Sequence, residues 1–250
     1  MAQKGPLALR LWKFKTAYIE DETPVDDLAF LSRHRDTLRE LSITGDERLD
    51  VAEINQLRAL EILSIHAPGG ANAMLRLGGL PALSQLIVFF RGDQADRLRI
   101  DWAGSSALER VSLDGPDAHD LAAIVGLPRL RDLTLDNFAT MPERFTPGLE
   151  ELALSGVGAW PATIDGLDHL VSLDLAESAT LRDLTPFAGA EPLESLVLYD
   201  LPGLRSLAGV RVLEDAHVAI QECPNLEDLG ALSRESAEGS ITGSPLVGCP

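Results

Sequence analysis

The feature that most constrains this chain is a motif of the form Leu-x-x-Leu-x-Leu, which restarts every 19 to 25 residues between Leu38 and Ile220. A fixed period of this length is typical of a solenoid, because each copy forms one coil that buries its apolar edge only against the next coil. The nine copies begin at Leu38, Leu60, Leu83, Leu108, Leu130, Leu149, Leu170, Leu193 and, in degenerate form, Asp215. The repeat predicts a stack of coils, a shape that offers a long surface and seldom a catalytic pocket.

Each copy has the pattern of a short strand. Apolar side chains fill the first, fourth and sixth positions, and the third, fifth and seventh alternate with them, so one face is buried and the other points outward. Between the strands, acidic starts at residues 50–60 and 117–125 predict short helices, and the apolar spacing at 181–189 predicts tight turns or a 3-10 segment. Residues 97–102 also alternate, but they lie too close to the neighbouring copies to form a coil, so we expect extra structure on the convex side.

The ends of the repeat need caps that shield the last leucine layers from water. Apolar and polar residues alternate over 7–16 and predict an edge strand, and residues 25–34 predict a helix. Ile241 takes the sixth position of a degenerate final copy of the repeat. The predicted single domain consists of an N-terminal cap at 1–37, the repeats at 38–232, and a C-terminal cap and tail at 233–250. The fold class is an α/β solenoid.

These copies resemble the leucine-rich repeat family, specifically the short-period bacterial kind found in internalin-like proteins, over about residues 38–232. The resemblance implies a curved, right-handed solenoid of about nine to ten coils, with a parallel sheet on the concave face, used mostly to bind other proteins. The family usually places Asn or Cys at the ninth position, and here only Cys223 matches. The row of ninth-position Asn side chains, called the asparagine ladder, is therefore missing. The backbone amides of the turns must bond to other partners, and we expect irregular coils.

Charge and composition narrow the class of partner. The chain has 21 Lys and Arg against 39 Asp and Glu, a net charge of −18, which repels phosphate backbones and anionic lipid. We therefore expect a basic protein partner, no nucleic acid and no membrane; the longest clean apolar run, at residues 86–90, is far short of the ~20 residues of a membrane span. With two cysteines and no visible secretory signal, we expect a cytoplasmic protein.

No pattern of catalytic or metal-binding residues is visible. The five histidines lie in different coils, and neither a paired Cys motif nor a phosphate-binding loop occurs, so we expect a non-enzymatic protein without cofactor or metal. His119 and Asp120 are interpreted as a solvated surface pair at a helix start. Cys223 is interpreted as a buried turn residue, and Trp160 as a rim or convex packing residue.

The outward positions supply the candidate site. An acidic strip gathers on the central coils, and its functional interpretation is a surface that steers a basic partner; the alternative is that an acidic protein has acids everywhere. Apolar spots suggest interface anchors, with the alternative that Phe89 or Phe90 folds over the long third coil. The candidate partner-binding residues are Ile62, His66, Ile87, Phe89, Arg110, Asp114, Asp132, Asp136, Glu151, Asp174, Val197 and Tyr199.

The sequence thus predicts a scaffold that binds a basic protein through its concave face, and an inhibitor or immunity-type protein is one form of this by fold-level analogy. The alternative function is a structural module that oligomerises through an exposed edge or a convex patch at 97–102. We expect a monomer rather than an oligomer.

Overall fold

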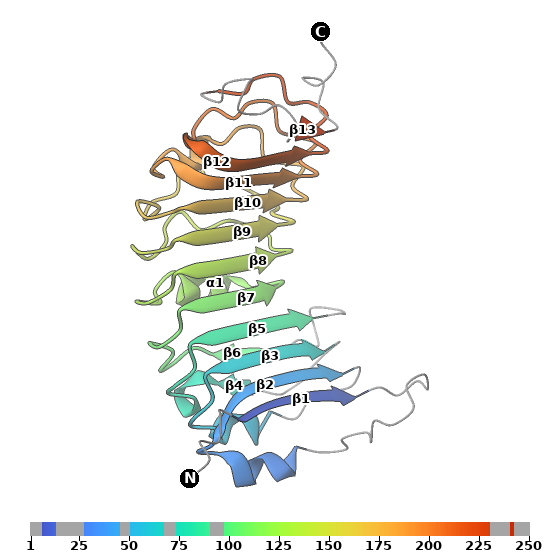
Figure 1. Ribbon diagram of the computed structural model, residues 1–250, viewed down its shortest axis with the longest axis vertical. Coiled ribbons are helices and arrows are strands. Elements are labelled where there is room, and N and C mark those ends of the chain that lie inside the picture. The colour runs from blue at the N-terminus through green and yellow to red at the C-terminus, as the bar shows by residue number, and fades with distance from the viewer. Residues whose placement is uncertain are drawn as a thin grey trace. The chain divides into compact units, whose positions relative to one another are not determined.

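The computed structural model describes residues 7–13, 28–45, 51–67, 74–90, 98–230 and 241–242. Its contacts divide the chain into two compact units, Met1–Asp114 and Gly115–Pro250, called unit 1 and unit 2 here. In each unit the strands of successive coils pair in parallel, and the connecting segments contain few helices (Figure 1). The chain is a parallel-strand solenoid, as the period predicts. The cap boundaries at 37 and 232 stay predictions.

Unit 1 confirms the predicted edge strand. Its strands pair in the order β1-β2-β3-β5-β7, and register matches equal positions of the motif, so that Leu41 lies beside Leu63 and Leu63 beside Leu86. All three of these leucines are fully buried. The strands are β1 (Leu7–Lys13), β2 (Leu38–Gly45), β3 (Ile62–Ala67), β5 (Gln85–Phe90) and β7 (Arg110–Asp114).

A separate two-stranded sheet lies outside this order. Strand β4 (Met74–Arg76) pairs in parallel with β6 (Arg99–Asp101), which confirms that residues 97–102 are extra structure rather than a further coil. The Asn55 side chain completes the edge of β4, because its Nδ2 donates to the Met74 carbonyl at 3.0 Å and its Oδ1 accepts the Arg76 N–H at 2.7 Å. An amide side chain here replaces a strand neighbour.

Unit 2 continues the same pattern over β8 (Asp132–Asp136), β9 (Glu151–Ser155), β10 (Ser172–Ala176), β11 (Leu193–Tyr199), β12 (Val212–Gln221) and β13 (Ile241–Thr242). Ile241 pairs with Ile220, which confirms its predicted place at the sixth position. The degenerate copy is irregular: the register shifts between the Leu193 and Ser195 pairs, and Leu213 is left 40% exposed. A bulge of this kind absorbs the extra residues of β12.

One predicted helix forms and another does not. Helix α1 (Ala118–Ile124) begins with a capping box, because the Asp117 carboxylate accepts the N–H groups of His119 and Asp120 at 2.8 and 2.9 Å, and the Asp120 carboxylate accepts the Asp117 N–H at 3.3 Å. Asp120 is consequently only 3% exposed, so the prediction of a solvated pair is wrong for this residue.

The other predicted helices are shorter and tighter. Within the described residues 51–60, the helical part is the 3-10 turn Ile54–Gln56, whose N-cap residue makes no side-chain bond; Asp50 lies outside the described residues. The described part of residues 25–34 forms the 3-10 segment Ala29–His34. Without a capping bond, acidic starts alone do not sustain an α-helix. The 3-10 segment Thr185–Phe187 confirms the prediction for 181–189.

Backbone bonds replace the missing asparagine ladder. The eighth position of each copy from β7 onward is left-handed, and its N–H donates to the seventh-position carbonyl of the following coil; examples are Asn137 to Ser155 at 2.9 Å and Glu177 to Tyr199 at 3.1 Å. At the ninth position, Ser178 is 1% exposed, and its hydroxyl donates to the Val157 carbonyl at 3.0 Å. The residues in the left-handed row are Gly115, Asn137, Gly156, Glu177, Asp200 and Glu222. Cys223 is fully buried, as predicted, and burial raises the pKa of its thiol.

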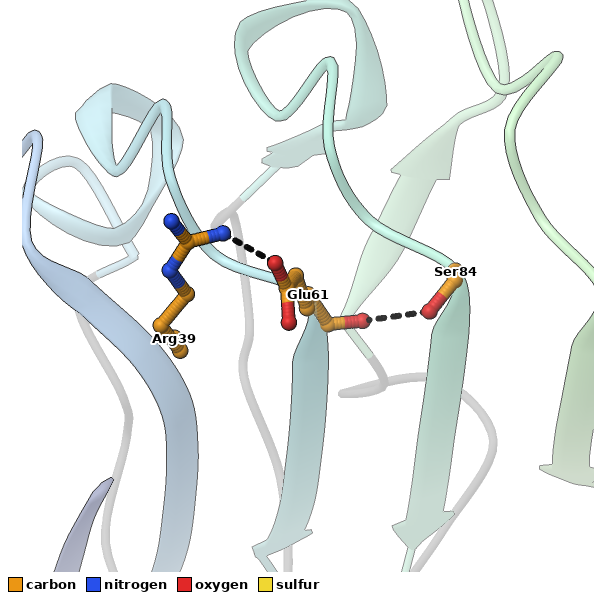
Figure 2. Close-up of polar contacts among 3 residues, drawn as sticks. All are labelled: Arg39, Glu61 and Ser84. Carbon is orange, nitrogen blue, oxygen red and sulfur yellow. Dashed lines mark hydrogen bonds and ion pairs between the residues drawn. The ribbon is translucent and has the colours of Figure 1, made fainter. Parts of the chain in front are cut away.

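Two ion pairs between coils join residues at the second position of the motif, at or next to the start of a strand. Figure 2 shows the guanidinium of Arg39 against the carboxylate of Glu61, whose backbone carbonyl accepts the Ser84 hydroxyl at 3.2 Å. Arg131 and Glu150 repeat the pair in unit 2 at 2.5 Å. The four charged side chains are 44% exposed or more, so each pair contributes less than about 1 kcal/mol.

Candidate protein-binding surface

The outward rows are the third, fifth and seventh positions of each copy, and in unit 2 they bring four predicted acids onto one sheet face. Register places Asp132 beside Glu151 in the third row, and Asp136 beside Ser155 in the seventh. Asp174 lies in the fifth row between Ala153 and Val197. Because neighbouring strands lie only about 4.8 Å apart, these carboxylates make a single negative region over β8, β9 and β10.

The permanently charged side chains in the outward rows of unit 2 are all acidic. The outward rows of β8 to β12 hold Asp132, Asp136, Glu151 and Asp174, and they hold no Lys or Arg. Three ion pairs in the described part of unit 2 lie outside these rows, and they join Arg131 to Glu150, Arg144 to Asp165 and Arg211 to Glu191. Among the described residues, the carboxylates of Glu151 and Asp174 make no hydrogen bond and no ion pair.

Asp174 has the most unusual environment of these acids. Its side chain is half-buried, and its row neighbours on either side are the apolar Ala153 and Val197. Burial raises the pKa of Asp174 above its ordinary value of 3.8, because the charged carboxylate has lost part of its hydration. A cation placed against this carboxylate would restore some of that lost stabilisation.

The second predicted apolar spot lies on the same face. Val197 is half-buried in the fifth row of β11, and Tyr199 is 40% exposed in the seventh row, between Ala176 and Gln221. The side chains near Val197 and Tyr199 in the outward rows are small and project little from the sheet; they include Ala153, Ala176 and Ser195. A phenol ring that projects beyond small neighbouring side chains can enter a pocket on a partner.

The outward face of unit 1 carries an apolar patch among polar and charged residues. Ile62 and Ile87 are half-buried, and the Phe89 ring stacks on the ring of His66 with centroids 5.1 Å apart and planes inclined by 25°. The Ser64 hydroxyl lies 2.9 Å from Nε2 of His66 and fixes that ring. Phe89 therefore packs sideways onto the neighbouring strand and is only partly exposed. The side chain of Phe90 is outside the described part.

Two further predicted residues also belong to unit 1. Arg110 is exposed on β7 beside Gln85, and Asp114 is half-buried at the end of the same strand. The predicted strip thus draws Asp114 from unit 1 and its other four acids from unit 2.

The size of the unit 2 face sets what it can do alone. Five strands about 4.8 Å apart and five residues long give a face of roughly 20 by 16 Å, or about 320 Å². A stable complex buries about 800 Å² on each partner. The face therefore supplies under half of a standard interface, and a partner must also contact its rim.

The sequence patterns missed two features of the coils. The pairs Arg39–Glu61 and Arg131–Glu150 join opposite charges at the same position of successive copies, and reading the second row down the repeat would reveal them. Asn55 gives no such indication, since its role depends on where β4 lies in space.

Among the described residues, no three His, Cys, Asp or Glu side chains gather in a way that could hold a metal ion. In that same part of the chain, no helix is long and apolar enough to cross a membrane. Comparisons with protein-family models, curated proteins and solved structures give no match.

Proposed function

We propose that this protein is a leucine-rich repeat scaffold, without catalytic activity, that binds a protein with a basic surface through the outward rows of unit 2. One observation carries the proposal: the outward rows of β8 to β12 hold four carboxylates and no Lys or Arg. The repeat period and the uniformly buried sixth position support the family assignment.

The acids and the tyrosine have separate roles in this proposal. Clustered carboxylates raise the rate of encounter with a basic partner and reject acidic ones, an effect that weakens as salt screens the charges. Asp174 receives a Lys or Arg of the partner, because its partly desolvated carboxylate gains most from a cation. Tyr199 supplies apolar contact area at the other end of the face. Neutralising a basic enzyme is one form that such binding takes, by fold-level analogy.

A charge-reversal experiment with a matched control tests the proposal. The site variant carries Glu151→Lys and Asp174→Lys, and the control carries Asp168→Lys and Glu227→Lys, two exposed acids outside the outward rows. Both variants change the net charge equally. The partner is captured from native lysate on the wild-type protein, and its association rate is measured by surface plasmon resonance at low and high salt.

We expect the site variant to slow association at low salt by about tenfold or more, and the control by less than about threefold. The salt dependence of the rate should also fall in the site variant. Equal slowing in both variants would mean that net charge alone matters, and the assignment of the face would then be wrong.

One observation favours a second candidate function, a self-assembly module. Met74 on β4 is 41% exposed, in a sheet whose described part consists of β4 and β6 alone. An assembly role requires a stable oligomer in the purified protein, and Met74→Lys should dissociate it. Light scattering of the two proteins without any partner distinguishes this function from the first.

A further inference from the structure

A groove of about 500 Å³ lies in unit 2 beside α1, and none of its lining residues belongs to the outward rows. Leu121, Ala122 and Val125 line it from the helix side, and Met141, Glu143 and Trp160 line it from the next two coils. The groove forms where the convex segments of successive coils change in width. The coil with α1 places a helix about 10 Å wide here, whereas the next two coils run as extended segments joined by the bridge between Thr140 and Ala159.

The wall of the groove is held in place before anything binds. Nε1 of Trp160 donates to the Ser178 hydroxyl at 3.0 Å, and the indole meets the Phe187 ring edge-on with centroids 5.8 Å apart. Ser178 is itself fixed by its bond to the Val157 carbonyl, and Met141 is 2% exposed. A preorganised wall of this kind loses little conformational entropy on binding.

The charge of the groove is simple. Glu143 is the one charged residue among those that line it, and it is exposed. Within the described part of the chain its carboxylate makes no ion pair, while its backbone carbonyl accepts the Asp165 N–H at 2.9 Å and so fixes where the side chain begins. The lining thus combines apolar side chains with one unneutralised carboxylate at the rim.

We propose that this groove docks a short segment of a second protein, in which a large apolar side chain is followed closely by Lys or Arg. The apolar group packs against Leu121, Met141 and Trp160, and the cation lies at Glu143. The groove is an open surface rather than an enclosed cavity, since Ala122 and Glu143 are both exposed, so it could not bury most of a small molecule. A protein segment, anchored on both sides of the groove, fits this shape better.

Defined peptides test the proposal without knowledge of the natural partner. The probes are acetyl-Leu-Phe-Lys-amide, its Glu analogue acetyl-Leu-Phe-Glu-amide, and the polar acetyl-Ser-Gly-Lys-amide, each titrated into the full-length protein. Binding is followed by amide chemical shifts and by the indole fluorescence that Trp160→Phe removes. We expect saturable shifts around Leu121 and Trp160, with the Lys peptide at least about threefold tighter than the Glu peptide. The polar peptide should produce no saturable shift.

Two variants separate docking from a general effect on the fold. Ala122→Arg places a long side chain in the groove and keeps a good helix former, so it should weaken the Lys peptide by about tenfold or more. Ala188→Arg, a matched change at an exposed site outside the lining, should leave binding unchanged. Glu143→Gln should bring the Lys and Glu peptides to equal affinity.

Several results would overturn the proposal. These are equal binding of all three peptides, shifts that lie elsewhere, or unchanged binding in Ala122→Arg. Self-association in light scattering that Ala122→Arg abolishes would show that a second copy occupies the groove, and it too would overturn the proposal. None of these variants alters the outward rows, so this test and the charge-reversal test fail independently.

Discussion

The outward faces of the two units differ although their buried rows are alike. In both units the fourth and sixth positions are filled by Leu, Ile or Val that are 5% exposed or less. Above this shared core, unit 1 presents Ile62, Ile87 and a stacked His66–Phe89 pair beside polar residues. Unit 2 presents four carboxylates among small residues, with Val197 and Tyr199 at one end. The repeat therefore determines the buried rows of each coil, whereas the residues of the outward rows differ between the two units.

The two faces also differ in whether their outward side chains contact other residues of the chain. Phe89 has a described partner in the ring of His66, which lies on the neighbouring strand. Asp174 and Glu151 have none among the described residues, although they lie on an equally regular sheet. A side chain that its own fold leaves unsatisfied is better suited to meet a partner than one already packed.

The largest expected effect tests whether the buried rows are equivalent. Leu63→Ala in unit 1 and Leu173→Ala in unit 2 each remove a fully buried side chain, and each should lower the free energy of unfolding by about 2–5 kcal/mol. The outward-row controls Ser42→Ala and Ser172→Ala should change it by less than about 0.5 kcal/mol. Urea denaturation followed by circular dichroism measures all four. A small loss in one unit and a large loss in the other would contradict a shared core.

The aromatic residues of the two faces should respond differently to truncation. Phe89→Ala removes a stacked and partly buried ring, so we expect a loss of about 1–2 kcal/mol in the free energy of unfolding. Tyr199→Ala removes a ring that is 40% exposed, and the loss should stay below about 0.5 kcal/mol. The same denaturation experiment measures both. Equal losses would mean that Tyr199 also serves the fold.

The sequence predicted the strands because alternation and period act locally and repeat many times. It also predicted that 97–102 would leave the main sheet and that Ile241 would take the sixth position. The convex segments were harder, because an acidic residue before a helix has an effect only if its side chain reaches the backbone. Asp117 does so, whereas Glu53, the N-cap residue of the 3-10 turn Ile54–Gln56, makes no side-chain bond to the backbone.

The candidate surface was only partly predictable. Row positions correctly placed Asp132 beside Glu151, since strand register follows from the repeat. The half-buried state of Asp174 and the stacking of Phe89 on His66 depend on neighbours a coil away and on side-chain rotamers. The groove at Trp160 depends on a difference in width between coils, which no single row contains.

A pH-dependent stability change should distinguish Asp174 from an ordinary surface acid. Because burial raises its pKa, the folded protein binds more protons than the unfolded chain above pH 3.8, and stability falls as pH rises through this window. Asp174→Asn removes that penalty. It should raise the free energy of unfolding at pH 7 by less than about 1 kcal/mol, since a half-buried side chain keeps much of its hydration.

The control for this prediction is Glu151→Gln, an exposed acid in the neighbouring coil. The advantage of Asp174→Asn over wild type should shrink as pH is lowered below the pKa of Asp174. Glu151→Gln measures the effect of removing a carboxylate charge from an exposed site on the same face. Denaturation midpoints at a series of pH values provide the test. A constant advantage at every pH would mean that the amide, rather than the lost charge, is responsible.

The smallest expected effect sharpens the contrast between satisfied and unsatisfied carboxylates within unit 2. Asp228 accepts the Ser206 hydroxyl at 2.6 Å and the Gly230 N–H at 2.9 Å, and these bonds lower its pKa below 3.8. Its contribution to stability is therefore present at neutral pH and lost as pH falls, the opposite of Asp174. Ser206→Ala should move the pKa of Asp228 back toward 3.8 and leave that of Asp174 unchanged, as carboxyl-carbon NMR titration can measure. If both pKa values moved together, the two carboxylates would share an electrostatic environment. The contrast between the hydrogen-bonded Asp228 and the unbonded Asp174 would then be wrong.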